Sequence, residues 1–319
     1  AYTGFRLPTL NELYRPFVVF PITTKANPAL KPERLRGVEG GFDLTPVDGG
    51  VRVGGTSGLV DATGKLLIVG DPKGLPISGL LRNLSQRAPE LGVLGGLAPP
   101  VGVGRAAVLL EGVRVRTGGV VGVHLGDDIN VRSFVAQGCR PVGEPMAVTG
   151  VDGSSLTELA GRSPMERIRE LAGQLDPGDR ELAAGGLHLG VVVDEHRLDY
   201  GRGDFVIRSV MGADRRSGAL LLAEPPPLGA TVQFQVRDPA GADADLDELA
   251  GLAGPAEAAL VFACAGRGTN LFDAPHHDAE RLVDLNGVGA LAGMFCAGEI
   301  GPIHGAARVH SFSAAVALF

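Results

Sequence analysis

An order of apolar strand, amphipathic helix and second apolar strand that occurs twice constrains the fold of this chain more than any other feature. In the first occurrence, the short apolar run at residues 66–70 is of the buried-strand type. Apolar residues at helical spacing then follow between Ile77 and Leu84, with Pro76 suited to a first helical turn. Residues 92–97 form the second short strand, with glycines near its exit.

The same order returns near the C-terminus. Residues 259–263 predict a strand, a glycine-rich polar turn follows, and residues 277–285 predict a helix. Residues 289–295 then form the second apolar run. Loops absorb small insertions at little cost, so the slightly longer second occurrence is compatible with an internal duplication.

Sheet-forming sequence dominates the rest of the chain. Ser163 and Glu166 are spaced as a capping box for a helix that stops at residues 176–178, and residues 243–252 predict a short acidic helix. Further strands are expected at residues 187–193, 205–210, 219–222, 231–236 and 309–319, and a hairpin at residues 106–115. The predicted fold class is α+β, with mixed, mostly antiparallel sheets packed together, helices outside, and an internal duplication.

The amino-acid composition argues against several classes of function. The net charge of -7 and the absence of tryptophan argue against nucleic acid, which calls for a basic face or stacking aromatic residues. Three cysteines without a CxxC spacing indicate neither a disulfide framework nor a structural zinc site, and no cofactor is predicted. Apolar runs are too short for a membrane helix and no basic leader opens the sequence, so we expect a cytoplasmic protein without a membrane role.

Candidate site residues gather in the last sixty positions. Arg267 lies between Gly266 and Gly268, directly after a predicted strand that ends at Cys264. Glycines let the backbone approach a ligand closely, and a guanidinium can hold a carboxylate at two points. Glu299, next to Gly298, can face an ammonium group. Together these charges would hold both ends of a free amino acid, with backbone amides of the turn as further anion donors.

Each of these residues also has a structural interpretation. Arg267 and Glu299 can pair with each other and fix two loops. Cys264 and Cys296 are small core residues or nucleophiles, and His310 is a hydrogen-bonded strand residue or their base. A second cationic contact can come from Arg140, in a glycine-rich turn at residues 137–140. The group at residues 276–278 has adjacent histidines without metal-ligand spacing, and a helix cap is the better interpretation.

Five motifs, taken in order, resemble FIST proteins. They are Gln137-Gly-Cys-Arg-Pro-Val-Gly-Glu-Pro145, Val191-Val-Val-Asp-Glu195, Gly203-Asp-Phe-Val-Ile-Arg208, Phe262-Ala-Cys-Ala-Gly-Arg-Gly268 and Phe295-Cys-Ala-Gly-Glu-Ile-Gly-Pro302. The resemblance runs from about residue 66 to residue 319. It implies paired FIST N and FIST C domains, which are sensory modules of bacterial signalling thought to bind small ligands such as amino acids. Eukaryotic relatives carry the same domains in F-box adaptors.

The resemblance divides the chain into three parts. Residues 1–55 resemble a fragment of a TonB-dependent outer-membrane receptor, and we expect them to be non-functional, disordered, or a cover for an open sheet edge. Such a fragment cannot close a barrel by itself and so cannot span a membrane. Residues 56–150 are the truncated FIST N-terminal domain, and residues 151–319 are the FIST C-terminal domain.

Three functions remain open from the sequence. The first is a non-enzymatic, cytoplasmic module that senses an amino acid or small carboxylate between its duplicated halves and passes the signal to a protein partner. Its ligand-binding residues would be Cys264, Gly266, Arg267, Gly268, Cys296, Gly298, Glu299, His310 and Arg140. The second is a cysteine-dependent hydrolase or transferase that uses Cys264 or Cys296 with His310. The third is a protein-recruiting adaptor.

Overall fold

The computed structural model describes residues 62–73, 76–99, 107–111, 114–197 and 199–319, together with short strands within residues 2–55. The chain forms two compact units, Ala1–Gly40 and Gly41–Phe319. The first unit holds two antiparallel strand pairs, β1 (Tyr2–Arg6) with β4 (Glu33–Gly37) and β2 (Phe17–Val19) with β3 (Ile22–Thr24). The expectation that residues 1–55 are disordered or cover a sheet edge concerns parts of this segment that lie outside the described residues.

Two sheets form the centre of the second unit. The first has five strands in the order β11 (Val120–Leu125), β7 (Lys65–Gly70), β8 (Gly92–Leu97), β22 (Gly298–Ile303) and β23 (Ala306–His310). The second has four strands in the order β12 (Arg132–Gln137), β24 (Ser313–Leu318), β20 (Ala258–Cys264) and β21 (Ala290–Cys296). In each sheet one pair is parallel, β7 with β8 and β20 with β21, and the other pairs are antiparallel.

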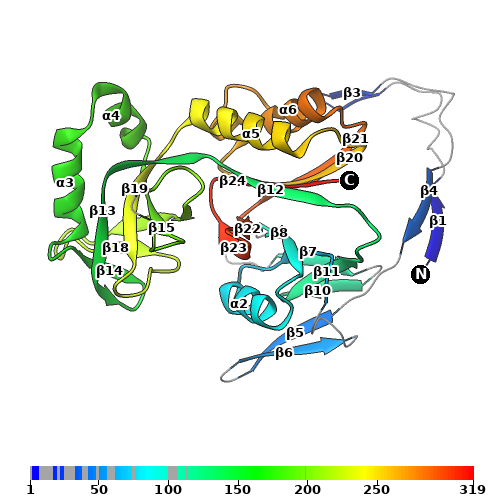
Figure 1. Ribbon diagram of the computed structural model, residues 1–319, viewed down its shortest axis with the longest axis horizontal. Helices are drawn as coiled ribbons and strands as arrows, with labels where there is room; N and C mark the ends of the chain where they lie inside the picture. Colours follow the sequence, from blue (N-terminus) through cyan, green and yellow to red (C-terminus); the bar gives the residue numbers. More distant parts are fainter. Residues whose placement is uncertain are drawn as a thin grey trace. The chain divides into compact units, whose positions relative to one another are not determined.

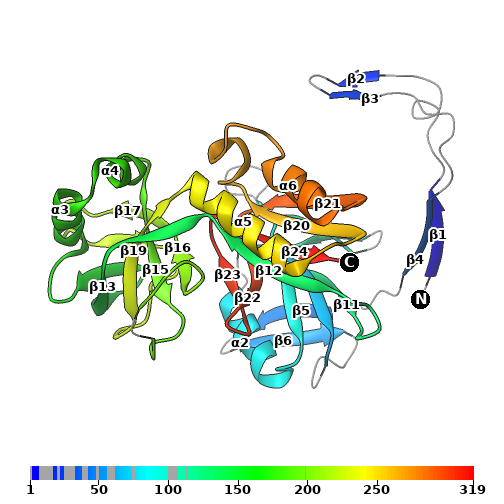
Figure 2. The same cartoon turned by 45° about the horizontal axis from the view of Figure 1, so that its top comes forward.

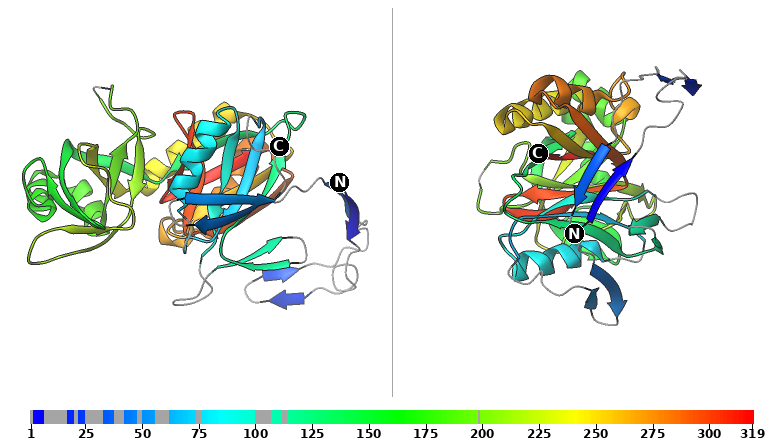
Figure 3. Two further views of the ribbon diagram at one scale, coloured as in Figure 1. Left: turned by 90° about the horizontal axis from the view of Figure 1, so that it is seen from below. Right: turned by 90° about the vertical axis from the view of Figure 1, so that its right-hand side faces the viewer.

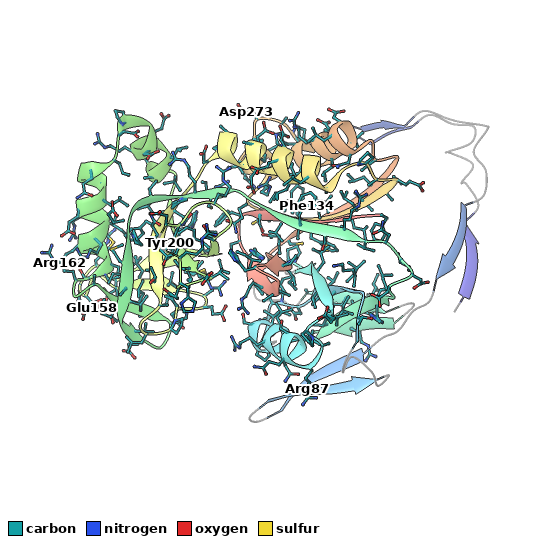
Figure 4. The ribbon with its side chains drawn as sticks, viewed as in Figure 1. Arg87, Phe134, Glu158, Arg162, Tyr200 and Asp273 are labelled. Atoms are coloured by element: carbon teal, nitrogen blue, oxygen red, sulfur yellow. The ribbon has the colours of Figure 1, made fainter. Side chains whose placement is uncertain are left out.

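Helices cover the outer faces of these two sheets. In β7, Leu66 and Ile68 pack with α2 (Ile77–Arg87), whereas Leu67 and Val69 pack toward the other sheet. One face of β7 is therefore buried and the other is partly buried, which explains why its sequence is a continuous apolar run. On the opposite side α5 (Pro239–Ala253) and α6 (His277–Asn286) cover the four-stranded sheet, so the order is helix, sheet, sheet, helix (Figures 1 and 3). Phe134 of β12 packs in the layer beneath α5 (Figure 4).

The duplication is confirmed, and the two copies share their sheets. Each copy contributes a strand, a helix and a parallel second strand, which are β7, α2 and β8 in the first and β20, α6 and β21 in the second. The hairpin of β22 and β23 then leaves its own copy and pairs with β8 of the other. In return, β12 from the first half pairs with β24 of the second.

A seven-stranded antiparallel sheet also belongs to the second unit, with α3 (Pro164–Gln174) and α4 (Pro177–Ala184) against it. Its strands are, in order, β16 (Phe205–Arg208), β15 (Leu187–Val192), β19 (Thr231–Arg237), β13 (Cys139–Asp152), β14 (Ser155–Leu159), β18 (Leu220–Leu222) and β17 (Val210–Ala213). The predicted capping box is present, because the Ser163 side chain accepts from the Glu166 amide and the Glu166 side chain from the Ser163 amide. Tyr200 lies in this part of the unit (Figure 4), and its ring meets that of Phe205 edge-on.

Several local expectations are corrected by the structure. Residues 137–140 are not a turn, since only Gly138 separates β12 from β13. The helix expected to stop at residues 176–178 ends at Gln174, and those residues begin α4, with Asp176 as its cap and proline in its first turn. The expected terminal strand at residues 309–319 is divided into β23 and β24 at Phe312, whose φ is 60°.

Other expectations are confirmed. The hairpin consists of β9 (Val108–Glu111) and β10 (Arg114–Thr117), and the acidic helix is α5, which begins earlier than predicted, at Pro239. The fold class is α+β with mixed and antiparallel sheets and helices outside. None of the helices that the structure describes combines the length and apolarity needed to span a bilayer.

Candidate functional site

Arg267 is a fully buried cation at the carboxyl end of β20. The chain turns there because the Arg267 amide donates to the Cys264 carbonyl at 2.9 Å and Gly268 adopts a φ of 55°. The guanidinium makes two hydrogen bonds to Asp278 of α6, Nε to Oδ2 at 2.8 Å and Nη2 to Oδ1 at 2.6 Å. Burial opposes ionisation of Asp278, but these bonds and the charge of Arg267 prevail, so the pKa of Asp278 lies below its ordinary value.

Glu299 is a fully buried acid on β22, the strand that joins the two copies. Its Oε2 accepts two hydrogen bonds from Ser313, one from the amide at 3.2 Å and one from the hydroxyl at 2.8 Å. Burial raises the pKa of Glu299 to about 8 in spite of these bonds. The side chain is therefore mostly protonated at neutral pH.

The three cysteines are buried free thiols. Cys264 and Cys296 lie opposite each other at the ends of the parallel pair β20 and β21. Burial, and next the nearby Glu299, raises the pKa of Cys264 to about 11. Burial raises the pKa of Cys139 to about 12 and that of Cys296 well above its ordinary value. Thiols with such pKa values are poor nucleophiles at neutral pH.

We call Cys264, Arg267, Asp278, Glu299 and Ser313 the buried polar cluster. No ion pair joins Arg267 to Glu299 in the part of the chain that the structure describes; Arg267 pairs with Asp278 instead. The two residues are nevertheless close enough for the Arg267 charge to lower the pKa of Glu299 slightly against the effect of burial. Each keeps one buried atom without a hydrogen-bond partner among the described residues, Nη1 of Arg267 and Oε1 of Glu299. Such atoms are rare in native proteins.

The remaining candidates lie around or away from this cluster. His310 lies opposite Glu299 in the β22–β23 pair, and its Nε2 is 3.1 Å from the Gly301 carbonyl oxygen. Burial lowers the pKa of His310 to about 4, so its imidazole is neutral at physiological pH. Arg140 lies apart, bound to Asp179 and Asp238.

The two flanking glycines allow close packing. A Cβ on Gly266 would lie 2.9 Å from the Phe312 ring, and one on Gly298 would lie 3.2 Å from Leu97 and from Val309. These positions therefore favour residues without a side chain. The structure thus brings Cys264, Arg267 and Glu299 together, as the sequence suggested.

A pocket of about 190 Å³ adjoins the buried polar cluster. We call it the α6 pocket, since it lies between the first turn of α6 and strands β20 and β21. Its apolar walls are Val261, Ala263, Leu291, Met294 and Phe295, and its remaining lining residues are Gly268, His276, His277, Asp278, Ala279 and Gly293. Two of these lining residues are close to Arg267: Gly268 is its neighbour in the chain, and Asp278 is its ion-pair partner.

Most charged groups at the α6 pocket already have partners. Both carboxylate oxygens of Asp278 bind Arg267, and His277 Nε2 lies 3.1 Å from Asp243 while its ring stacks on Phe272. The expected helix cap is not formed by a side chain, because His276 occupies the cap position with a φ of 64° and makes no capping hydrogen bond. The first turn of α6, whose residues line the pocket, thus has no side chain that accepts from its backbone amides.

Sequence reasoning missed Asp278 and the α6 pocket. Asp278 was interpreted as part of a helix cap, although it is the partner of Arg267 eleven positions earlier. The available signal was an acid in the first turn of the helix that directly follows the Arg267 turn. Fold and pocket together define a tandem α+β protein with a cavity sized for a small molecule.

The family comparison agrees with this class. The FIST N domain model matches residues 24–162 and the FIST C domain model matches residues 164–302. This chain belongs to the FIST family. The match begins at residue 24, earlier than the position near residue 66 that the motifs indicated. FIST domains are regarded as small-ligand-sensing domains of signal transduction, sensory rather than catalytic.

Proteins of similar sequence occur in mycobacteria. The uncharacterized proteins Rv0628c of Mycobacterium tuberculosis and Mb0898c of Mycobacterium bovis are each 45% identical over 261 residues. The aligned region covers 79% of this chain and 67% of each relative. The resemblance of residues 1–55 to a TonB-dependent receptor stays a prediction.

Proposed function

We propose that this protein senses a small carboxylate with an apolar body, a class that includes amino acids, through the α6 pocket. The observation that carries the proposal is that this pocket shares Asp278 and Gly268 with the surroundings of the buried Arg267. A ligand there contacts the same groups that hold the guanidinium in place. The site lies beside the buried polar cluster, where strands of the two copies interleave.

The size of the pocket limits the ligand. Pockets for drug-sized molecules usually exceed about 300 Å³. At about 190 Å³, the α6 pocket suits a molecule of amino-acid size rather than a nucleotide. Its walls from Leu291, Met294 and Phe295 favour an apolar body.

The polar end of the pocket selects the charge of the ligand. Residues 277–279 of the first turn of α6 line the pocket, their amides have no side-chain cap, and the dipole of a helix favours an anion at this end by about 0.3 to 1 kcal/mol. The negative charge of Asp278 is already compensated by Arg267. A carboxylate therefore completes the polar end better than an ammonium group.

Transmission to the rest of the protein follows from the contacts of Arg267. Ligand contact with the start of α6 acts on Asp278, and Asp278 fixes Arg267. The charge of Arg267 in turn influences Glu299, which lies on the strand shared with the first copy. The cytoplasmic location, the output of the signal and a signalling partner remain predictions.

Thermal stabilisation by ligands tests the proposal. We expect one or more small carboxylates, from a panel of apolar amino acids and short-chain acids, to raise the melting temperature. Ala279→Phe, which fills the pocket from α6, should abolish the shift, whereas Leu285→Phe, at an exposed site on the same helix outside the pocket lining, should preserve it. A panel without effect, or an equal shift in Ala279→Phe, would contradict the proposal.

Thiol chemistry receives no comparable support. Burial raises the pKa of Cys264 to about 11, and the His310 imidazole makes its hydrogen bond to a backbone carbonyl of β22. A nucleophilic pair needs a thiol and a base within hydrogen-bond reach. Protein recruitment without a ligand likewise has no specific observation in its favour.

A further inference from the structure

Strand β21 forms one edge of the four-stranded sheet. It pairs with β20 on one side, and no other strand in the described parts of the chain pairs with it. Its seven residues, Ala290–Cys296, contain neither a charge nor a proline. Phe295 is 52% exposed, and Ala290, Ala292 and Gly293 are exposed as well. Natural sheets rarely leave an apolar edge of this kind uncovered.

The duplication shows what covers the equivalent edge of the first copy. Strand β8 corresponds to β21, since each is the second strand of a parallel pair. Beyond β8 lies β22, antiparallel, with Leu97 opposite Gly298 and Gly95 opposite Ile300. The hairpin of β22 and β23 also packs against α2, because Ile300 and Ala307 share a core with that helix. The fold therefore accepts an antiparallel strand at this position.

The second copy presents the same two surfaces without such a cover in the described residues. Helix α6 lies beside β21 (Figure 2), and its Val283 is 43% exposed. A further hollow between this helix and the edge strand is lined by Ala279, Val283 and Leu291 together with the acidic residues Glu280 and Asp284. The exposed edge strand, which carries no charge, thus lies next to a helix side that carries both apolar and acidic residues.

We propose that two copies of this chain associate through β21, pairing their edge strands antiparallel to form a continuous sheet. A two-fold axis brings a strand together with itself in the antiparallel direction, which is the direction that β22 takes against β8. Because β21 carries no charge, self-pairing creates no like-charge repulsion within the strand. Gly293, at the middle of the strand, keeps the centre of the pairing free of bulky side chains.

This association completes the α6 pocket. Leu291, Met294 and Phe295 of β21 line the pocket, so the strand of the second copy lies along its border. Dimerisation through β21 does not depend on the ligand assignment, although it would give a ligand in the pocket a direct route to the oligomeric state.

Sedimentation velocity of the full chain without ligand tests the proposal. We expect the wild-type chain at micromolar concentrations to sediment as a dimer, with a mass twice the 32.8 kDa of one chain. Ala292→Lys, which places like charges at the centre of the pairing and leaves the lining of the α6 pocket unchanged, should weaken association at least 100-fold. Leu252→Lys removes a 78% exposed apolar residue from α5 and serves as the matched control, with wild-type association expected.

A charge-complementation experiment distinguishes a loss of association from a folding defect in the variant. Ala292→Lys and Ala292→Glu should each be monomeric, and an equimolar mixture should regain the dimer. The proposal is overturned if the wild type is monomeric at 100 µM, if Ala292→Lys dimerises like the wild type, or if the mixture stays monomeric. Slow hydrogen exchange of the β21 amides in a monomeric wild type would show instead that the edge is closed within one chain.

Discussion

Replacement of Glu299 by glutamine tests the buried polar cluster through its pH dependence. The folded protein holds the pKa of this acid at about 8, against an ordinary value of 4.5, because the side chain is buried. Below pH 4.5 both the folded and the unfolded chain are protonated at this position, and Glu299 costs nothing. Above that pH the unfolded chain loses its proton while the folded chain retains it, so the free energy of unfolding decreases as the pH rises.

The magnitude follows from the difference between the two pKa values. Each pH unit between 4.5 and about 8 costs about 1.4 kcal/mol, and above pH 8 the cost is constant. The total is roughly 4 to 5 kcal/mol, a large share of the stability of a typical protein. Glutamine cannot ionise, and its amide oxygen can still accept from Ser313.

Urea unfolding of the wild type and Glu299→Gln at several pH values between 5 and 8.5 measures this difference. We expect the variant to gain stability relative to the wild type by about 1.4 kcal/mol per pH unit up to about pH 8. Effects of other titrating groups cancel in the comparison, and Glu90→Gln on the surface provides a control. A difference that stays within about 0.5 kcal/mol across this range would refute the reasoning.

Two further predictions concern the same region. Asp278→Asn leaves the fully buried Arg267 charge without its partner and should lower the free energy of unfolding, measured in urea, by about 3 to 5 kcal/mol. The double variant Arg267→Met/Asp278→Leu removes both charges and should lose less stability. A loss below about 1 kcal/mol in the single variant would mean that the pair does not stabilise the turn. Because the pKa of Cys264 is raised to about 11 and that of Cys139 to about 12, all three buried thiols should react with iodoacetamide at pH 8 at least roughly 100-fold more slowly than a free thiol. Rapid labelling of one thiol, read by mass spectrometry, would favour thiol chemistry.

The repeated strand, helix and strand could be predicted because each element has a strong local pattern. Both faces of β7 and β20 are buried or partly buried, which gives short uninterrupted apolar runs, and α2 has an apolar stripe at helical spacing. In contrast, β13 was missed because Pro141, Gly143 and Pro145 within it resemble turn signals. The strand tolerates them through a register shift between Val142 and Met146.

The candidate site could be predicted only in part. Arg267 and Glu299 come together because they lie at the ends of strands in the two packed sheets. The pairing of β22 with β8 of the other copy could not be predicted, because nothing local to β22 specifies which edge it joins. Arg140 was placed wrongly in a turn; it lies on β13, which continues into the seven-stranded sheet and carries it to Asp179 and Asp238.

A crystal structure of the chain with the most stabilising small carboxylate tests the central claim most directly. The account predicts that the ligand occupies the α6 pocket, with its carboxylate within hydrogen-bond distance of backbone amides at residues 277–279 and its apolar body against Leu291 and Phe295. A ligand bound elsewhere, or held in this pocket with its carboxylate turned away from the start of α6, would contradict it.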